Sequence, residues 1–459
     1  MSNSSMKGLL KKYNVPAPRY TSYPTVPYWE AAPTEDQWIT LLNESIDEGG
    51  KSGTGAAIYI HIPFCETLCT YCGCNTRITK NHGVGGPYIE LIEQEWQLYK
   101  KKLNRSGPIQ VSEIHLGGGT PTFLTADELK QMLEPIFKDI ELLDGYECSV
   151  EVDPRVTNYD QLKVLAEMGF RRISLGIQDF DPKVQEIVNR IQPYEIVKKC
   201  VDDARSLGYE SVNFDLIYGL PFQNLDSVRD TLDKVSQLKP ERIAFYAYAH
   251  VPWIKPSHRK FTETDLPNPD DKRALYELGR DLLSSHGYHE IGMDHFSLEH
   301  DSLWHASKES TLHRNFMGYT SKQVSPLIGL GVSAIGDSWA GFIQNEKVLE
   351  KYRSRVLAGE LPILRGHTLT DEDKVLRRHI LNLMTAFETE WQSSSLKDPF
   401  LNSVAERLEE LVKDGLVEVN DLSVKITESG RPFIRNISMA FDARLARRAP
   451  NTSLFSQSI

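Results

Sequence analysis

The sequence lacks any hydrophobic run long enough to cross a bilayer, and its first residues, MSNSSMKGLLKKYNVP, lack the apolar centre of a secretory signal peptide. It also lacks an excess of basic residues, because 52 lysines and arginines stand against 63 aspartates and glutamates, a formal net charge of −11. Nucleic acids and anionic membranes both favour a basic surface. We therefore expect a cytoplasmic protein that binds neither a nucleic acid nor a membrane.

Cysteine is scarce, with six residues in 459, yet four of the six fall within ten positions: Cys65, Cys69, Cys72 and Cys74. Thiols stay reduced in the cytoplasm, so clustered cysteines indicate metal binding or redox chemistry more than structural disulfides. Cys148 and Cys200 stand alone and are expected to be buried core residues.

Short β-branched or aromatic runs recur along the middle of the chain, and each is followed by a stretch with helical spacing of apolar residues. The expected strands are residues 56–62, 112–116, 147–152, 171–177, 211–217 and 242–248. Six strand-then-helix units indicate a parallel sheet with right-handed crossovers, either open or curled into a barrel. In both cases the functional site lies at the carboxyl ends of the strands.

The polar and glycine-rich segments of the chain follow these strands one after another. They are the cysteine loop, GGGTP (117–121), EVDP (151–154), GIQDF (176–180), DLIYGLP (215–221) and YAHVP (248–252). Because the carboxyl ends of parallel strands meet at one edge of the sheet, these segments predict one shared active site.

The two ends of the chain differ from its middle. Residues 1–50 contain Pro16, Pro18, Pro24 and Pro27 and are expected to be irregular. After about residue 365 the pattern predicts helices over 371–384 and 403–415 and a hairpin over 415–427, as in a winged-helix domain. The predicted parts are an N-terminal extension that contributes to the substrate site (1–50), a strand–helix barrel with following strands (51–362) and a mainly helical C-terminal domain (363–459).

The cysteine loop has the spacing C-x3-C-x2-C through Cys65, Cys69 and Cys72. A structural zinc site usually takes two separated pairs of ligands, and only one compact group is present. A [4Fe–4S] cluster normally takes four cysteines, so three would leave one iron open to a substrate. Cys74 lies only two residues beyond Cys72, which makes it difficult for both to reach the same cluster. Zinc binding and a Cys72–Cys74 redox pair stay open as alternatives, although C-G-C gives awkward disulfide geometry.

A C-x3-C-x2-C loop after a first strand resembles the signature of the radical S-adenosylmethionine (SAM) enzymes. In that family three cysteines hold a [4Fe–4S] cluster, and the amine and carboxylate of SAM bind the fourth iron. The GGGTP segment resembles the turn that holds the SAM amino group, although a tight strand-to-helix turn alone would also use glycine.

The resemblance extends along nearly the whole chain to the oxygen-independent coproporphyrinogen III oxidases (dehydrogenases) of haem biosynthesis. It is carried by PRYTSYP (18–24), the cysteine loop with its CGC ending, GGGTPT, EVDPR, GIQDF, VNR, DLIYGLP, YAHVP, GMDHF (292–296), HRNFMGYT (313–320), GVSAIG (331–336) and GRPFIRNISMAFD (430–442). It implies an α/β fold, a partial (β/α)6 barrel with an N-terminal extension and a mainly helical C-terminal domain.

The same resemblance implies the cofactor-binding residues, with two SAM molecules beside one cluster. Cys65, Cys69 and Cys72 would bind the cluster. The first SAM would contact Tyr59, Gly118, Glu151 and Ile335. The second would contact Tyr71, Gly119, Thr120, Gln178, Arg190, Asp215 and Ala249. Taken alone, Glu151 could equally form a surface salt bridge, and an isolated Arg190 would be a solvated or paired surface residue.

The implied reaction converts two propionates of coproporphyrinogen III to vinyl groups and gives protoporphyrinogen IX. The propionate β-carbon C–H bond is unactivated, so the cofactor must supply the reactivity. We expect catalytic roles for Cys74, Arg19 and Tyr20, with Tyr23, His313 and Arg314 as further candidate substrate contacts. An internal salt bridge is the alternative for Arg19. The family also implies an electron donor such as flavodoxin or ferredoxin, and we expect a monomer.

Two other functions remain possible at this point. A haem-binding chaperone of the same superfamily resembles this chain around the cysteine loop, but such relatives generally lack PRYTSYP and the CGC ending. A zinc-stabilised binding module without catalysis is the second alternative.

Overall fold

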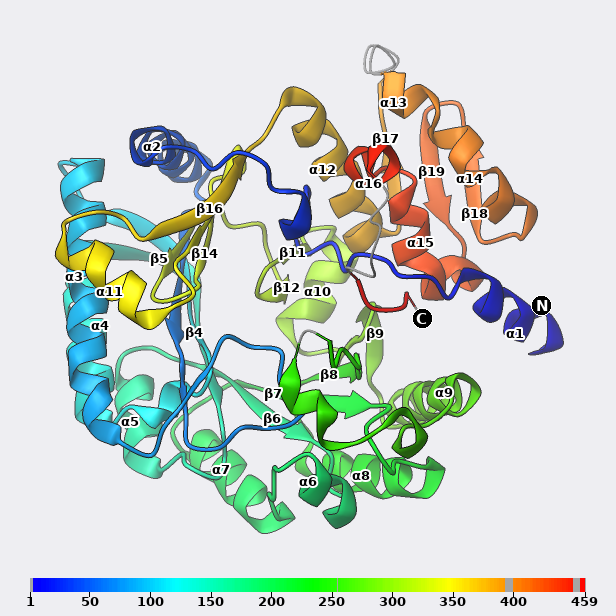
Figure 1. Ribbon diagram of the computed structural model, residues 1–459, viewed down its shortest axis with the longest axis horizontal. Helices are drawn as coiled ribbons and strands as arrows, with labels where there is room; N and C mark the ends of the chain where they lie inside the picture. Colours follow the sequence, from blue (N-terminus) through cyan, green and yellow to red (C-terminus); the bar gives the residue numbers. More distant parts are fainter. Residues whose placement is uncertain (1–2, 254, 393–398, 449–454, 459) are drawn as a thin grey trace.

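A computed structural model describes residues 3–253, 255–392, 399–448 and 455–458. The described residues form a curved sheet of twelve strands in the order β16-β15-β14-β13-β1-β4-β5-β6-β7-β8-β10-β9, which bends around a central space (Figure 1). Its six parallel strands β1 and β4–β8 are Ala56–Ile62, Ile109–Gly118, Ile140–Val152, Arg172–Gln178, Ser211–Tyr218 and Arg242–Ala247. All six predicted strands are confirmed.

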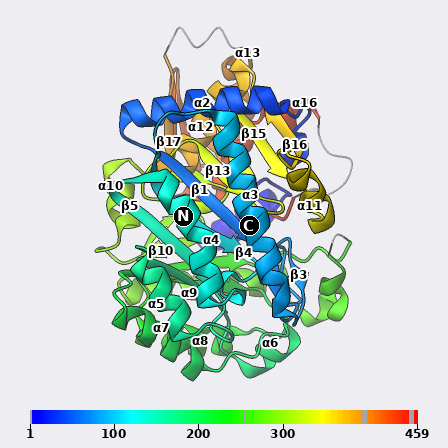
Figure 2. The same ribbon diagram turned by 90° about the vertical axis from the view of Figure 1, so that its left-hand side faces the viewer.

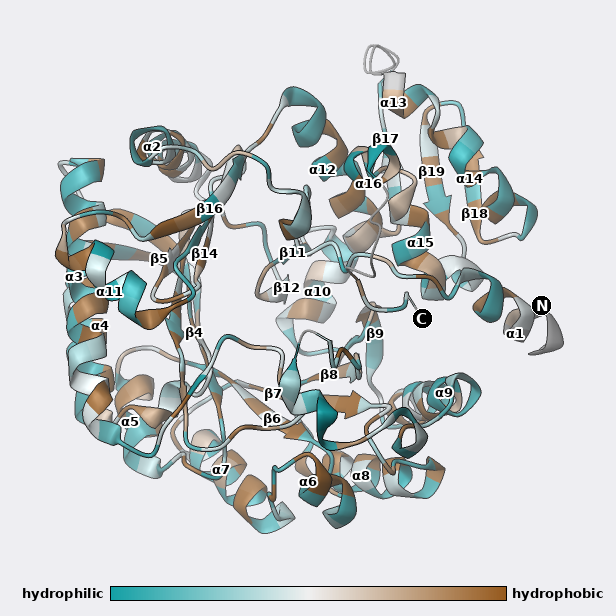
Figure 3. Cartoon of the chain, viewed as in Figure 1, coloured by the Kyte–Doolittle hydropathy of each residue, from teal (hydrophilic) through white to brown (hydrophobic). Residues whose placement is uncertain are grey.

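Helices cover the outer face of the parallel strands (Figures 1 and 2). They are α3 (Gly85–Leu103), α4 (Ala126–Asp139), α5 (Tyr159–Glu167), α6 (Pro182–Ile187), α7 (Tyr194–Ser206), α8 (Leu225–Leu238) and α9 (Pro269–Ser285). Helix α4 begins with a capping box between Thr125 and Glu128, each side chain bonding the other residue's backbone N–H. The hydropathy colours show apolar residues concentrated on the strands and on the helix faces that touch them (Figure 3).

The sheet continues beyond both ends of the parallel set. On one side β13 (Leu327–Leu330) pairs parallel with β1, followed by antiparallel β14 (Ile335–Asp337), β15 (Gly341–Asn345) and β16 (Ile363–Thr368). On the other side β10 (His295–Ser297) pairs with β8, and β9 (His289–Gly292) pairs with β10. The connections include α10 (Ser302–Glu309), α11 (Leu349–Leu357) and the hairpin of β11 (His313–Asn315) and β12 (Gly318–Thr320).

The prediction that residues 1–50 are irregular is wrong at both ends of that range. Helix α1 spans Asn3–Tyr13 and helix α2 spans Glu35–Ser52, so the prolines interrupt only the segment between the helices. Helix α2 begins with a capping box of Thr34 and Gln37. It inserts Trp38, which is fully buried, into the main core, and it lies across one end of the sheet (Figure 2).

A second apolar core forms around the C-terminal elements α12 (Asp371–Ala386), β17 (Glu388–Glu390), α13 (Pro399–Asn402), α14 (Val404–Lys413), β18 (Val417–Asn420), β19 (Ser423–Ile426), α15 (Ile434–Met439) and α16 (Ala443–Arg447). The predicted hairpin is confirmed, with its turn between Asn420 and Ser423. Leu10 and Tyr13 of α1 belong to the same core, so the two ends of the chain pack together. The division at residues 50 and 362 stays a prediction. No helix of the described residues is long and apolar enough to cross a membrane.

Glu95 of α3 is a fully buried carboxyl that ties the helix to the extension of the sheet. It accepts hydrogen bonds from the Gly331 backbone N–H (2.7 Å), the Asn345 side-chain amide (2.7 Å) and the Tyr352 hydroxyl (2.6 Å). Burial outweighs these three donors and raises the pKa of Glu95 to about 7.

This burial predicts a pH-dependent stability. Between the ordinary carboxyl pKa of 4.5 and about 7, the folded protein keeps a proton that the unfolded chain has lost, so stability falls as the pH rises through that window. Glutamine does not titrate, so between these pH values the free energy of unfolding of Glu95→Gln should fall by up to about 3 kcal/mol less than that of the wild type. Thermal unfolding measured from pH 5 to pH 8 tests this, with exposed Glu93→Gln on the same helix as the control. Equal slopes for Glu95→Gln and the wild type would contradict it.

Candidate active site

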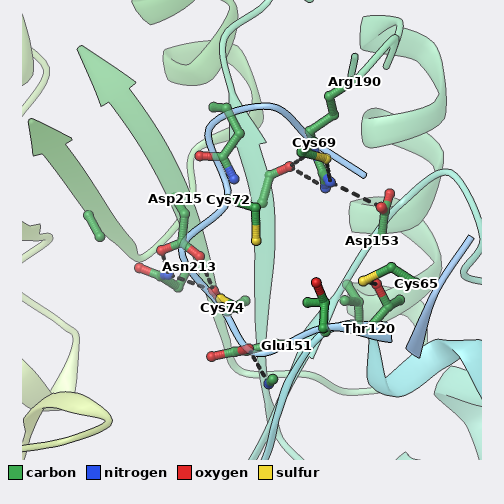
Figure 4. A pocket seen from close by; sticks show the side chains of 18 of the residues that line it. Cys65, Cys69, Cys72, Cys74, Thr120, Glu151, Asp153, Arg190, Asn213 and Asp215 are labelled. Atoms are coloured by element: carbon green, nitrogen blue, oxygen red, sulfur yellow. Dashed lines mark hydrogen bonds and ion pairs between the residues drawn. The ribbon is translucent and has the colours of Figure 1, made fainter. Parts of the chain in front are cut away.

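A cavity of about 480 Å³ lies inside the curved sheet, at the carboxyl ends of its parallel strands. All four clustered cysteines line it (Figure 4). The other predicted site residues in its wall are Tyr71, Gly118, Gly119, Thr120, Glu151, Gln178, Arg190 and Asp215. Twelve of the predicted residues thus share one cavity, and they come from five different parts of the chain.

The cysteine loop is fixed by backbone contacts on both of its flanks. It begins in β2 (Phe64–Cys65) and ends in β3 (Arg77–Ile78), and these two short strands pair with each other. The Arg77 N–H donates to the Pro63 carbonyl (2.7 Å), and the Thr70 N–H donates to the Val188 carbonyl (3.0 Å). The loop is therefore a closed unit held against α6.

The thiols of this loop fit the ligand set of an iron–sulfur cluster. Among the described residues no three His, Cys, Asp or Glu side chains lie close enough to hold a single metal ion. Three thiolates that bind different irons of one cluster do not have to meet at a point, as the ligands of one ion must. Cys65 lies beside the Thr120 hydroxyl at 3.4 Å, and Cys69 is buried.

Two arginines lie against the Cys69 sulfur. The guanidinium of Arg190 lies 3.7 Å from the Cys69 sulfur and that of Arg155 lies 3.8 Å from it. Both also bind Asp153, at 3.0 Å and 2.6 Å. Burial opposes ionisation of Asp153, but the two arginines lower its pKa. Cationic neighbours favour a thiolate, which is the form that binds iron. Sequence reasoning missed Asp153 and Arg155, although both belong to the EVDPR motif.

Cys74 differs from the other three thiols. It acts as a hydrogen-bond donor to Cys72, which lowers the pKa of Cys72 to about 6 with help from the charges of Lys255 and Arg190. The same contact raises the pKa of Cys74 well above its ordinary value. The division of the four thiols into three cluster ligands and one neighbour stays a prediction.

The glycines at the end of β4 allow its backbone to approach the cysteine loop. Gly118 has a φ of +115°, and a Cβ there would lie 2.7 Å from the ring of His61. A Cβ on Gly119 would lie 2.8 Å from the Phe64 carbonyl oxygen. The Gly119 N–H donates to the Ile62 carbonyl at 2.7 Å, so neither glycine can be replaced without moving the loop.

Glu151 is held in place by a chain of polar contacts from its neighbouring strands. The Gly118 N–H donates to one carboxylate oxygen (3.1 Å), and the His115 Nε2 lies 3.3 Å from the other. His115 in turn contacts the Ser149 hydroxyl through Nδ1 at 2.7 Å, and the ring of Tyr59 stacks on it. Burial opposes ionisation of Glu151, but these donors outweigh it and lower its pKa. Sequence reasoning missed His115, which lies two residues before Gly117 on the same strand face.

A second polar group lies on the next strands. Asp215 accepts from Ser174 (3.1 Å) and Asn213 (3.0 Å), and burial together with the charge of Glu151 raises its pKa to about 6. The Oε1 atom of Gln178 is buried with no hydrogen-bond partner. A buried acceptor without a donor is costly, so this wall of the cavity fits a polar ligand that donates a hydrogen bond.

The remaining predicted residues lie outside the lining of the cavity. Tyr59 lies behind His115, Ile335 begins β14, and Ala249 follows β8 between Tyr248 and His250. Their assignment to SAM stays a prediction. Arg19 pairs with Asp294 at 3.0 Å, which is the internal salt bridge given above as the alternative.

Tyr20 is also away from the cavity. Its side chain is buried in the second core, and its hydroxyl donates to Asp442 at 3.1 Å. The structure therefore does not bring Tyr20 to the clustered cysteines.

The cysteine loop lies at the mouth of a parallel half-barrel, and residues 59–235 match the sequence model of the Radical SAM superfamily. Over 445 residues the chain is 38% identical to the oxygen-independent coproporphyrinogen III oxidase of Pseudomonas aeruginosa, covering 95% of each protein. It is 36% identical to the Escherichia coli enzyme of that name over 452 residues, covering 96% of each. The chain therefore belongs to the family of oxygen-independent coproporphyrinogen III oxidases.

The fold agrees with a solved member of this family. The Escherichia coli coproporphyrinogen III oxidase HemN, described as a radical SAM enzyme, superposes with a TM-score of 0.86 at 35% identity. The match covers 95% of this chain and 98% of that one. The predicted partial barrel with a helical C-terminal part is confirmed, and membership of the family brings a [4Fe–4S] cluster and SAM as cofactors.

The cysteine geometry predicts two classes of variant. Cys65→Ser, Cys69→Ser and Cys72→Ser each lose the cluster because one iron loses its ligand. Cys74→Ser keeps the cluster but turns over more slowly. Iron content and the visible absorption after anaerobic reconstitution measure the first effect, and product formation measures the second. Cys200→Ser, outside the loop, is the control. Loss of iron from Cys74→Ser would contradict the assignment of three cysteines as cluster ligands and of Cys74 as a neighbour that does not bind iron.

The contacts of Glu151 predict its part in SAM binding. Glu151→Gln removes a carboxylate that would accept two ribose hydroxyls, so we expect SAM affinity to fall at least about tenfold. His115→Phe keeps a ring against Tyr59 but frees the carboxylate, so a smaller loss of affinity is expected. Equilibrium SAM binding to the reconstituted protein measures both. Glu141→Gln, on the exposed start of the same strand, is the control. Unchanged affinity in Glu151→Gln would exclude the assignment.

Proposed function

We propose that this chain catalyses the oxygen-independent oxidative decarboxylation of two propionate side chains of coproporphyrinogen III, giving protoporphyrinogen IX in haem biosynthesis. The observation that carries the proposal is the single cavity in which the cysteine loop, the Gly118–Gly119 turn, Glu151 and Arg190 meet. Identity of 36–38% to curated oxidases over nearly the full length supports the substrate.

When bound, the cluster and SAM supply radical chemistry that can remove a hydrogen atom from an unactivated carbon, which no side-chain base can do. The protein's own residues bind and orient. Cys65, Cys69 and Cys72 hold the cluster, and Arg155 and Arg190 neutralise charge at Cys69. Glu151, kept ionised by His115 and Gly118, orients a ribose. The curved sheet surrounds these groups and keeps bulk water out.

We propose that two SAM molecules occupy the cavity together. The support is that its wall carries two separate polar groups. One is Glu151 with Gly118, and the other is Gln178, Arg190 and Asp215 from the following strands and the segment after α6. The unpartnered Oε1 of Gln178 belongs to the second group and is accounted for by a second polar ligand.

The part of the cavity wall formed by β8, β10 and β12 suits an anionic substrate. Tyr246, His295 and Tyr319 line it, and the guanidinium of Arg314 lies over the Tyr319 ring at 4.6 Å. Arg314 is buried, and its Nε and Nη1 have no hydrogen-bond partner. A buried cation without a carboxylate is costly, so we propose that a substrate propionate approaches Arg314.

The other candidate substrate contacts differ in their surroundings. Arg19 lies over the Tyr246 ring at 5.8 Å, and we retain it as a proposed contact that would share its charge between Asp294 and a propionate. We propose that Tyr20 positions the N-terminal segment through Asp442 and does not take part in the reaction. Burial and the charge of Arg377 lower the pKa of His313 to about 4, so His313 is neutral and gives no cation.

The electron donor, flavodoxin or ferredoxin, and the monomeric state stay predictions from the sequence. A haem chaperone of the same superfamily is the remaining alternative function.

Anaerobic conversion of coproporphyrinogen III tests the proposal directly. The reconstituted protein, given a reductant and SAM, should release CO2 and form protoporphyrinogen IX together with 5′-deoxyadenosine. Cleavage of SAM with no change of the porphyrinogen, together with haem binding, would identify a chaperone instead.

In the same assay Arg19→Ala should raise the KM for coproporphyrinogen III about tenfold while the cluster stays intact, since one charged contact is lost. An unchanged KM removes Arg19 from the substrate site.

A further inference from the structure

Three basic side chains gather where the cysteine loop ends, and no role above accounts for them. They are Lys255 in the segment after β8, Lys347 directly after β15, and Arg365 in β16. The Lys255 ammonium donates to the Cys74 carbonyl at 3.3 Å. The Asn75 side-chain amide donates to the Lys347 carbonyl at 3.1 Å. The segments that follow β8 and β15 thus contact the end of the cysteine loop at Cys74 and Asn75.

This basic cluster, defined as Lys255, Lys347 and Arg365, has no acidic partner among the ion pairs of the described residues. The carboxylates nearest in sequence are engaged elsewhere, Glu350 with Arg77 (2.5 Å) and Glu346 with Arg355 (3.3 Å). Arg365 has neutral neighbours, donating to the Gln344 amide oxygen at 2.8 Å and facing the ring of Trp29 at 5.8 Å.

The positive charges of Arg365 and Lys255 act on Lys347. Partial burial, together with the positive charges of Arg365 and Lys255, lowers the pKa of Lys347, and partial burial lowers that of Arg365. None of the three has a carboxylate partner among the ion pairs of the described residues. A group of like charges that lacks one is stabilised when an anion binds among them.

We propose that the basic cluster binds carboxylate groups of the substrate, namely propionates that are not reacting. This inference rests on the proposed function, because coproporphyrinogen III carries four propionates of which two are converted. Lys255 meets the loop at the Cys74 carbonyl, and Cys74 lines the cavity, so a substrate held there by its outer carboxylates would present the other side of its macrocycle to the cavity. The basic cluster then selects a polycarboxylate and fixes its orientation.

The carboxylate of SAM has the same chemistry as a propionate, so the test must separate the two sources. Lys255→Gln, Lys347→Gln, Arg365→Gln and the triple variant are compared as anaerobically reconstituted holoenzymes. The matched control is Lys351→Gln, an exposed lysine on neighbouring α11. The probes are coproporphyrin III, its uncharged tetramethyl ester, and SAM, each titrated to give a Kd.

We expect each single variant to raise the Kd for coproporphyrin III about threefold and the triple variant on the order of thirtyfold. The tetramethyl ester and SAM should bind all variants as they bind the wild type, and Lys255→Arg with Lys347→Arg should restore affinity for the acid. An intact iron–sulfur absorption band in each variant shows that the fold is retained.

Equal binding of coproporphyrin III by the wild type and the triple variant would overturn the inference while leaving the proposed function standing. Weaker SAM binding with unchanged porphyrin binding would also overturn it, because the carboxylate would then be that of SAM. A wild-type holoenzyme that binds SAM but neither binds nor converts the porphyrinogen would overturn the proposed function, and the inference with it.

Discussion

The close contact between the end of β4 and the start of the cysteine loop is the constraint on which the rest of the site depends. Gly118 and Gly119 let the β4 backbone touch His61, Pro63 and Phe64, and the Gly119 N–H bonds the Ile62 carbonyl. This contact brings Thr120 to Cys65 and points the Gly118 N–H at Glu151. The positions of the first cluster ligand and of the proposed ribose contact are therefore set by one pair of glycines.

Charge is distributed so that an acidic chain can hold anionic ligands. Arg155 and Arg190 lie beside Cys69 and share Asp153, which fixes two cations where the iron–sulfur cluster is proposed to bind. His115 and Gly118 act on a negative charge instead, since their contacts with the half-buried Glu151 carboxylate lower its pKa. Local pairing outweighs the overall net charge of −11, which is why bulk composition did not identify the ligand.

The sequence predicted the parallel strands well because each carries β-branched or aromatic residues and is followed by a stretch with helical spacing of apolar residues. The prediction for residues 1–50 was wrong because it extended the irregular structure indicated by the prolines at 16–27 over the whole range. Trp38, Leu42 and Ile46 have the four-residue spacing of a helix, and they lie in α2. In the site, the motifs located the cysteines, Glu151 and Arg190. His115 was missed because its contacts with Ser149 and Glu151 cross between strands, and the register of strand pairing is not visible in one sequence. Asp153 was missed because its partner Arg190 lies far along the chain, after α6.

The transfer of hydrogen from the substrate to the cofactor tests the central claim most directly. Coproporphyrinogen III carrying deuterium on the β-carbons of its propionates is incubated anaerobically with the reconstituted protein, a reductant and SAM. Deuterium in the 5′-deoxyadenosine, in proportion to the vinyl groups formed, is the result expected of this site. Vinyl product formed alongside unlabelled 5′-deoxyadenosine would contradict the account, because the hydrogen would then leave by a route that the cavity around Cys65, Cys69 and Cys72 does not provide.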